Sequence, residues 1–111
     1  SAAWPYQGRR FDAIVVTNYL FRPLFPHLLD ALAADGVLIY ETFTAGNETV
    51  GKPSRADFLL QTGELLSATV GLRTVAYEDG FEALPDRFVQ RITAVRAALS
   101  GEPVRWHLAS H

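Results

Sequence analysis

Two short polar segments carry the residues whose types could do chemistry. Thr17, Asn18 and Tyr19 directly follow the apolar run Ala13–Val16, and Glu41 lies near the end of a second apolar run. In open α/β sheets, ligands bind outside the carboxyl ends of the strands, so these hydroxyl, amide and carboxylate groups are candidate ligand contacts. The alternative is a buried strand followed by a polar turn that binds nothing.

Glu41 is the candidate general base. It ends the apolar segment Val37–Phe43, and a carboxylate buried there beside Asn18 would accept a proton more readily near neutral pH. The alternative is a structural carboxylate that caps a loop or pairs with Arg55 or Lys52. Elsewhere the sequence has no His, Asp or Glu set with metal-ligand spacing, so no metal site is predicted.

The elements that position these groups form a predicted β-strand, helix, β-strand unit. The segment 11–19 is typical of a strand buried on both faces of a parallel sheet. Leucines recur at helical spacing from about Pro23 to Ala34, and Gly36 is a helix stop signal. A strand over 37–43 follows. Because such a crossover makes its two strands parallel, the two polar segments are expected at the same edge of the sheet.

The second half of the chain is predicted to close the sheet. Residues 44–57 form a polar loop, either a lid or a surface linker, and a short helix with Thr62 as N-cap runs to Gly71. A strand over 72–78 either turns at Asp79–Gly80 or continues through 81–83 with a bulge. After a turn at 84–86, a last strand over 87–97 pairs with it antiparallel. Residues 99–111 are a polar tail with Trp106 as its anchor.

Composition limits the classes of function. The 111 residues suffice for one domain, and the net charge of −2 favours neither nucleic acid nor an anionic membrane as a partner. Arg87, Arg91 and Arg96 do not share one face and predict a solvated strand edge. No apolar run approaches the ~20 residues of a membrane span. The absence of cysteine fits a reducing cytoplasm, which is the predicted location.

The order of elements is similar to the second half of a class I S-adenosylmethionine-dependent methyltransferase. The segment 11–20 (FDAIVVTNYL) resembles the fourth strand of that family, and 34–43 (ADGVLIYETF) resembles its "L-x-x-G-G-x-L" segment and fifth strand, with Asp35 where glycine is commoner. Gly46-Asn47-Glu48 and the segment 53–65 resemble a bacterial branch near the tellurite-resistance-type methyltransferases. The resemblance covers residues 4 to about 98.

This resemblance implies an α/β fold: a Rossmann-like methyltransferase half, with two parallel strands joined by a crossover helix and a C-terminal antiparallel strand pair. It also implies methyl transfer from S-adenosylmethionine to a small molecule. Thr17, Asn18 and Tyr19 would contact the cofactor, and Glu41 would be the base. The expected contacts of the methyl acceptor are Tyr40, Phe43 and Asn47, although Tyr40 and Phe43 are also expected in the core. The loop 45–57 and the region around Phe81 would shape the acceptor site.

One departure from the family is large. The glycine-rich loop and the acidic residue that bind the cofactor in the family are absent, so this chain alone is expected to be inactive and to bind no cofactor appreciably. Residues 1–10 are interpreted as a connecting loop from a missing N-terminal half, 11–98 as the C-terminal half, and 99–111 as the tail. The absence of methionine, also at position 1, fits either a truncated start or removal of an initiator Met.

An exposed strand edge is the second consequence of a missing half. The strand at 12–17 would then template pairing with another chain, by homodimerisation or strand exchange, unless the chain is part of a longer polypeptide. The alternative function is therefore a non-catalytic α/β interaction module that dimerises or pairs through this edge.

Overall fold

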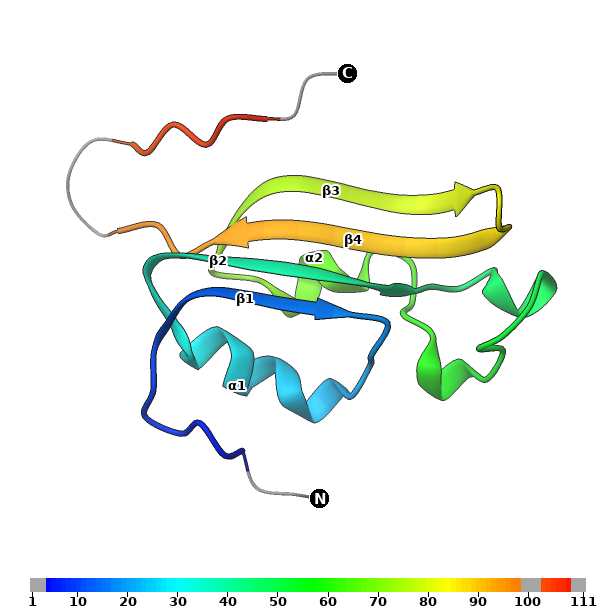
Figure 1. Ribbon diagram of the computed structural model, residues 1–111, viewed down its shortest axis with the longest axis horizontal. Helices are drawn as coiled ribbons and strands as arrows, with labels where there is room; N and C mark the ends of the chain where they lie inside the picture. The colour runs from blue at the N-terminus through cyan, green and yellow to red at the C-terminus, as the bar shows by residue number, and fades with distance from the viewer. Residues whose placement is uncertain (1–3, 99–102, 109–111) are drawn as a thin grey trace.

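The computed structural model describes residues 4–98 and 103–108. It is a mixed α/β domain built on one four-stranded sheet with the strand order β1-β2-β4-β3 (Figure 1). Strand β1 spans Phe11–Thr17, β2 Leu32–Phe43, β3 Arg73–Glu82 and β4 Arg87–Val95. The helices are η1 (Arg22–Leu24), α1 (Phe25–Asp30), η2 (Asn47–Thr49), η3 (Ala56–Phe58) and α2 (Glu64–Ala68).

The first three main elements form the predicted parallel unit. β1 pairs parallel with β2, and Thr17 lies opposite Glu41 in the register. The two strands point the same way in Figure 1, so their carboxyl ends meet at one edge of the sheet. The prediction that the two polar segments emerge side by side is therefore confirmed.

The helix between these strands is shorter than predicted. α1 ends at Asp30, not near Ala34, because Leu32 already pairs with Phe11 as the first residue of β2. Asp35, not Gly36, takes the left-handed conformation, with φ of 61°. Gly36 is needed for close packing instead, since a Cβ there would lie 2.8 Å from the Ala33 carbonyl oxygen. The predicted helix stop at Gly36 was wrong.

β3 and β4 form the predicted antiparallel pair, and β4 also pairs antiparallel with β2. β3 continues through Asp79 and Gly80 to Glu82, so the tight turn considered there is not formed. Phe81 accordingly lies in a strand, with its ring 5.1 Å from that of Phe88. The bulge lies earlier, between Thr74 and Ala76. The predicted turn at 84–86 is confirmed and begins one residue earlier, at residue 83.

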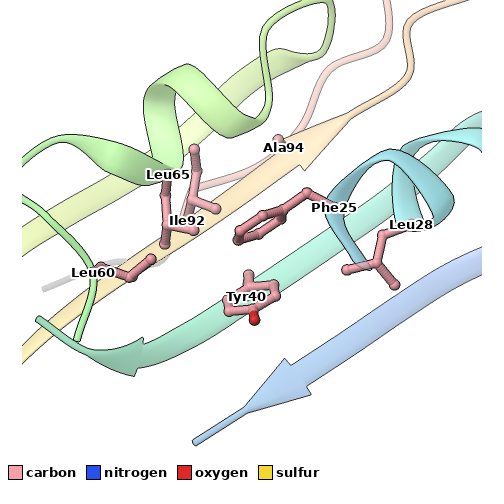
Figure 2. Close-up of a cluster of buried hydrophobic side chains, with 7 residues drawn as sticks. All are labelled: Phe25, Leu28, Tyr40, Leu60, Leu65, Ile92 and Ala94. Atoms are coloured by element: carbon pink, nitrogen blue, oxygen red, sulfur yellow. The ribbon is translucent and has the colours of Figure 1, made fainter. Parts of the chain in front are cut away.

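The hydrophobic core lies on one face of the sheet. Figure 2 shows Phe25 and Leu28 of α1 and Leu65 of α2 packed against side chains of β2 and β4. Burial of these side chains is the main stabilising contribution. The sheet side chains in this cluster are Tyr40, Ile92 and Ala94, joined by Leu60.

The other face of the sheet, called the open face below, carries the alternate side chains. Val15 is 62% exposed and Ile39 is 40% exposed on it. No helix within residues 4–98 covers this face. The prediction that the first strand is buried on both faces was wrong: β1 is an edge strand, and α1 and α2 pack on one face of the sheet only.

The two ends of the described chain differ in how closely they pack against the domain. Trp4 packs against the core, and its ring stacks on His27 of α1 at 5.7 Å. Trp106 is half-buried and lines a hollow with Asp35 and Arg73. The rest of the predicted tail, residues 99–102 and 109–111, lies outside the described residues. None of the described helices is long and apolar enough to cross a membrane.

Candidate functional site

The carboxyl ends of β1 and β2 bring together the first group of predicted site residues. The Asn18 backbone N–H donates to the Glu41 carbonyl oxygen at 2.9 Å, which extends the parallel pairing by one residue. Asn18 has a left-handed φ of 55°, a conformation that Asn tolerates better than most residues and that turns the chain away from the sheet. The side chains of Thr17, Asn18 and Tyr19 are exposed at this turn.

Tyr40 fixes this turn from the core side. Its hydroxyl donates to the Tyr19 carbonyl oxygen at 2.5 Å, and the residue is 1% exposed. Burial raises the pKa of Tyr40 to about 12, because the phenolate would lose its hydration. Tyr40 therefore lies in the core on the helix-covered face, and its polar atom is already bonded within the chain.

Glu41 points to the opposite, open face and belongs to an ion-pair cluster of Glu41, Glu78, Glu82, Arg87 and Arg91. Arg91 is its centre: the guanidinium donates to Glu41 Oε1 at 2.7 Å, to Glu78 at 2.8 Å and to Glu82 at 2.7 Å. Arg87 donates to Glu82 and lies 3.9 Å from Glu41 Oε2.

The cluster corrects two expectations. Glu41 pairs with Arg91 of β4, not with Arg55 or Lys52, because the antiparallel register sets Arg91 directly opposite Glu41. Arg91 is also not a merely solvated edge residue, since it binds three carboxylates. Hydrogen bonds from Arg91 and Arg87 hold the pKa of Glu82 below its usual value. The hydrogen bonds that Arg91 donates to Glu41, Glu78 and Glu82 raise its own pKa.

The two oxygens of the Glu41 carboxylate differ in their contacts with the arginines. Oε1 accepts the short hydrogen bond from Arg91, whereas Oε2 is only 3.9 Å from Arg87. With three carboxylates and two guanidiniums, the cluster carries one excess negative charge.

The remaining predicted acceptor contacts lie further along β2. Phe43 is half-buried on the open face, opposite Val89 of β4. Asn47 is 1% exposed, its amide donates to the Pro53 carbonyl oxygen at 3.0 Å, and its oxygen accepts the Phe88 N–H at 3.0 Å. Both ends of the Asn47 amide are thus bonded within the chain, where they fix the loop after β2.

A buried amide fastens the end of this loop. Gln90 of β4 is 0% exposed and donates to the Thr44 hydroxyl and to the Gln61 carbonyl oxygen. Its side-chain oxygen accepts the Leu65 N–H at the start of α2 at 2.7 Å. The loop is therefore tied to the sheet at both its ends, and its middle is exposed.

A hollow of about 520 Å³ lies beneath this loop, next to Arg22. The Arg22 guanidinium donates to both oxygens of Glu64, at 2.6 and 2.9 Å, and to the Leu59 carbonyl oxygen at 2.9 Å. The pair lowers the pKa of Glu64 and raises that of Arg22. Further lining residues are Glu48, Ser54, Asp57 and Gln61.

A second hollow, of about 490 Å³, lies on the open face. Ile39, Val75 and Leu108 give it apolar walls, and Glu41, Glu78 and Arg91 of the ion-pair cluster give it a charged side. Glu41 is thus the predicted site residue that reaches a hollow on the open face.

Sequence reasoning missed both charged groups at these hollows. The ion-pair cluster had a usable signal, because the predicted turn at 84–86 sets Glu82 opposite Arg87 and Glu78 opposite Arg91 in a hairpin. The Arg22–Glu64 pair had none, since it joins residues 42 apart through the path of an irregular loop. Within the described ranges, no group of three or more His, Cys, Asp or Glu side chains could hold a metal ion.

No model of a known protein family matches the chain, and no curated protein matches its sequence.

Proposed function

We propose that this chain forms part of a methyltransferase that transfers a methyl group from S-adenosylmethionine to a small molecule. The observation that supports it most is the meeting of Thr17 and Asn18 with Glu41 at the carboxyl ends of two parallel strands. The parallel β1–α1–β2 unit followed by the antiparallel β3–β4 pair is the order of elements that the resemblance to a Rossmann-like methyltransferase half implies.

The exposed groups suit one part of such a cofactor. The Thr17 hydroxyl and the Asn18 amide oxygen can accept hydrogen bonds from its amino group, and the Tyr19 ring can wall the methyl position. When bound, the cofactor would supply an electrophilic methyl group on its sulfonium sulfur. The chain's own residues then act mainly by positioning, which contributes several kcal/mol to an in-line displacement. Glu41 Oε2 would take the acceptor's proton where the acceptor carries one.

A titration of the ¹⁵N-labelled chain with S-adenosylhomocysteine tests this proposal. The described residues offer one wall of a site, so the expected dissociation constant is weak, on the order of 1 mM, which NMR detects. The backbone signals of Thr17, Asn18, Tyr19 and Glu41 should shift together. Shifts that are absent, or confined to residues elsewhere, would contradict the assignment of the site.

Two glycine substitutions provide a matched control. Asn18 and Asp35 both hold a positive φ, at opposite ends of the strands, so glycine fits the backbone at either position. Asn18→Gly should remove the shifts, because it removes the amide that contacts the cofactor. Asp35→Gly should leave them unchanged.

A second candidate function is an interaction module that pairs through a strand edge. The specific observation in its favour is that β1 is an edge strand with the apolar side chain of Val15 largely exposed. If S-adenosylhomocysteine does not change the melting temperature and the chain associates stably with itself, this candidate is favoured over the methyltransferase.

A further inference from the structure

The loop after β2, residues 44–61, is fixed to the sheet at its two ends but not in its middle. The buried amides of Asn47 and Gln90 hold the ends. The middle part, residues 48–58, contains no buried residue, and its hydrogen bonds all go to residues 46–59 of the same loop. Its position therefore depends on what fixes the residue that follows it.

Arg22 of η1 fixes that following residue, Leu59, from outside the loop. Its guanidinium donates to the Leu59 carbonyl oxygen at 2.9 Å and to both oxygens of Glu64 at the start of α2. Glu64 Oε1 in turn accepts the Gln61 N–H at 2.8 Å. One side chain from the segment after β1 thus clamps the end of the loop to the first turn of α2.

The Arg22–Glu64 pair is the most water-accessible of the contacts that hold the loop. The Arg22 side chain is 39% exposed and that of Glu64 is 17% exposed, whereas Asn47 and Gln90 are at most 1% exposed. Breaking a buried amide bond leaves polar atoms without a partner, but water can replace the partners of a partly exposed ion pair at little cost. The loop is therefore expected to open first at Arg22.

The hollow of about 520 Å³ lies between this pair and the middle of the loop. The clamped side contributes Arg22, Leu59, Leu60 and Gln61, and the middle part contributes Glu48, Ser54, Ala56 and Asp57. A hollow of this volume is within the range of small-molecule sites. Movement of the middle part away from Arg22 would widen it.

We propose that residues 48–58 form a lid on this hollow and that the Arg22–Glu64 pair is the latch that keeps the lid closed. With the latch formed, the Leu59 carbonyl is fixed and η3 ends against it. When Arg22 releases Leu59, residues 48–58 can move away while the two buried amides keep the ends of the loop in place. The hollow then admits a small molecule.

The latch also bears on the candidate site, and this part alone rests on the proposed function. Arg22 follows Tyr19 by three residues, and the Tyr19 carbonyl is held by the Tyr40 hydroxyl. A cofactor bound at this turn would restrict the movement of η1 and so favour the closed latch, since a ligand shifts the population toward the state that it binds better. The lid would then close over the methyl acceptor only when the cofactor is in place.

Limited proteolysis with trypsin tests the latch, because the lid contains its own reporter bond. Trypsin cleaves after Lys and Arg but not before Pro, so Lys52 is not a site and the bond between Arg55 and Ala56 is the one site in the lid. Arg22 is also followed by proline, so its replacement removes no site. Arg55 directly precedes η3, and cleavage there requires this part of the loop to unfold locally, so its rate reports the open population.

Arg22→Gln should speed cleavage at Arg55 about tenfold, because the Leu59 carbonyl and Glu64 lose their charged partner. Glu64→Ala should do the same, and the double variant should be cleaved no faster than Arg22→Gln alone, since both changes break one latch. A wild-type rate in Arg22→Gln, or effects of the two changes that multiply, would overturn the proposal.

Arg91→Gln is the matched control, since it breaks the ion pairs of another arginine, on the open face of the sheet. It should leave the rate of cleavage at Arg55 unchanged. Mass spectrometry identifies the cleaved bond, and circular dichroism verifies that each variant is folded. Cleavage at Arg55 that Arg91→Gln speeds as much as Arg22→Gln would report a general loss of stability and would equally overturn the latch.

Amide hydrogen exchange of the wild-type chain gives a second reading that needs no variant. The Phe58 and Leu59 amides bond within the loop, to Arg55 and Ala56, and should exchange together as the lid opens. The Leu60 amide bonds to the Phe43 carbonyl of β2 and should exchange much more slowly. Equal protection of all three amides would mean that the lid does not open separately from the sheet.

These readings are taken without cofactor, so failure of the lid and failure of the methyltransferase proposal are distinguishable. Added S-adenosylhomocysteine should slow cleavage at Arg55 in the wild-type chain, through the turn that precedes Arg22. If it shifts the NMR signals of the turn but does not slow this cleavage, the link between the turn and the latch is wrong.

Discussion

Strand β2 presents the two faces of the sheet side by side, and its alternate residues have opposite surroundings. Leu38, Tyr40 and Thr42 are at most 2% exposed beneath the helices. Ile39 is 40% exposed on the open face, and its neighbour Glu41 is held by arginines instead of apolar contacts. One strand therefore contributes both to a hydrophobic core and to a charged surface.

The comparison separates stability from the candidate chemistry. The helix-covered face holds the buried cluster that stabilises the domain. The open face and the strand ends hold Thr17, Glu41 and the ion-pair cluster, where side chains remain accessible to a ligand. Substitutions on the two faces should accordingly differ in kind.

The largest expected effect comes from truncating one isoleucine on each face. Ile92→Ala should lower the free energy of unfolding by about 3 kcal/mol, because it leaves a cavity in the core cluster. Ile39→Ala should cost less than about 1 kcal/mol, since that side chain is already partly in water. Urea unfolding followed by circular dichroism measures both. Equal costs would mean that something covers the open face in solution.

Replacing a buried polar side chain on the helix-covered face should lower the free energy of unfolding by nearly as much. Gln90→Leu should destabilise by about 2 kcal/mol, because the Leu65 N–H, the Gln61 carbonyl and the Thr44 hydroxyl lose their buried partner. On the open face of the same strand, Thr93→Val should be close to neutral. The comparison fails if Gln90→Leu unfolds at the same urea concentration as the wild type.

The sequence predicted the elements of this fold better than their surroundings. Strand and helix types followed from apolar runs and leucine spacing, and the antiparallel pair followed from a turn signal that lies between two strands. The apolar run of β1 wrongly predicted burial on both faces. Apolar side chains alternate between the two faces of a strand, but their type does not show which face is covered by helices. That depends on where the helices pack, and here both pack on one face.

The candidate site was predictable only where strand order fixes it. The adjacency of Thr17 and Glu41 follows from parallel pairing alone, so reasoning from the sequence found it. The partner of Glu41 depends on the register of β2 with β4. This register sets Arg91, which is fifty residues later in the sequence, opposite Glu41. Arg55 and Lys52 were expected only because they are near in sequence. The roles of Asn47 and Gln90 as loop anchors depend on contacts of irregular segments, which residue patterns do not encode.

The buried hydroxyl of Tyr40 makes the stability of the helix-covered face depend on pH. Its pKa of about 12 in the folded chain exceeds the ordinary value of 10.0, so the folded state holds its proton more tightly than the unfolded state. This contribution to stability is complete below pH 10 and is lost as the pH rises toward 12. Tyr40→Phe should cost about 1 kcal/mol at neutral pH, through the lost hydrogen bond to Tyr19, and should reduce the alkaline loss of stability. Urea unfolding between pH 8 and 11 would contradict the prediction if wild type and variant lose stability in parallel.

The smallest effect is expected on the open face, at the centre of the ion-pair cluster. Arg91→Leu should lower the free energy of unfolding by less than about 1 kcal/mol at low salt, because partly exposed ion pairs contribute little and salt screens them. Its pH dependence should be clearer than its size. The pKa of Glu82 is lowered by Arg91, so the stabilisation is present above the ordinary carboxyl value of 4.5 and is lost as the pH falls through the folded value.

The variant should therefore differ most from the wild type near neutral pH at low salt, and the two should converge in acid and in about 1 M salt. Arg55→Leu is the control, since Arg55 and Asp57 form an exposed ion pair that is not part of the cluster, with 3.5 Å between their charged atoms. A cost of Arg91→Leu that rivals Ile92→Ala, and that salt does not reduce, would mean that the open face is buried against something. That result would abolish the distinction between the two faces and would identify the ion-pair cluster as part of an interface.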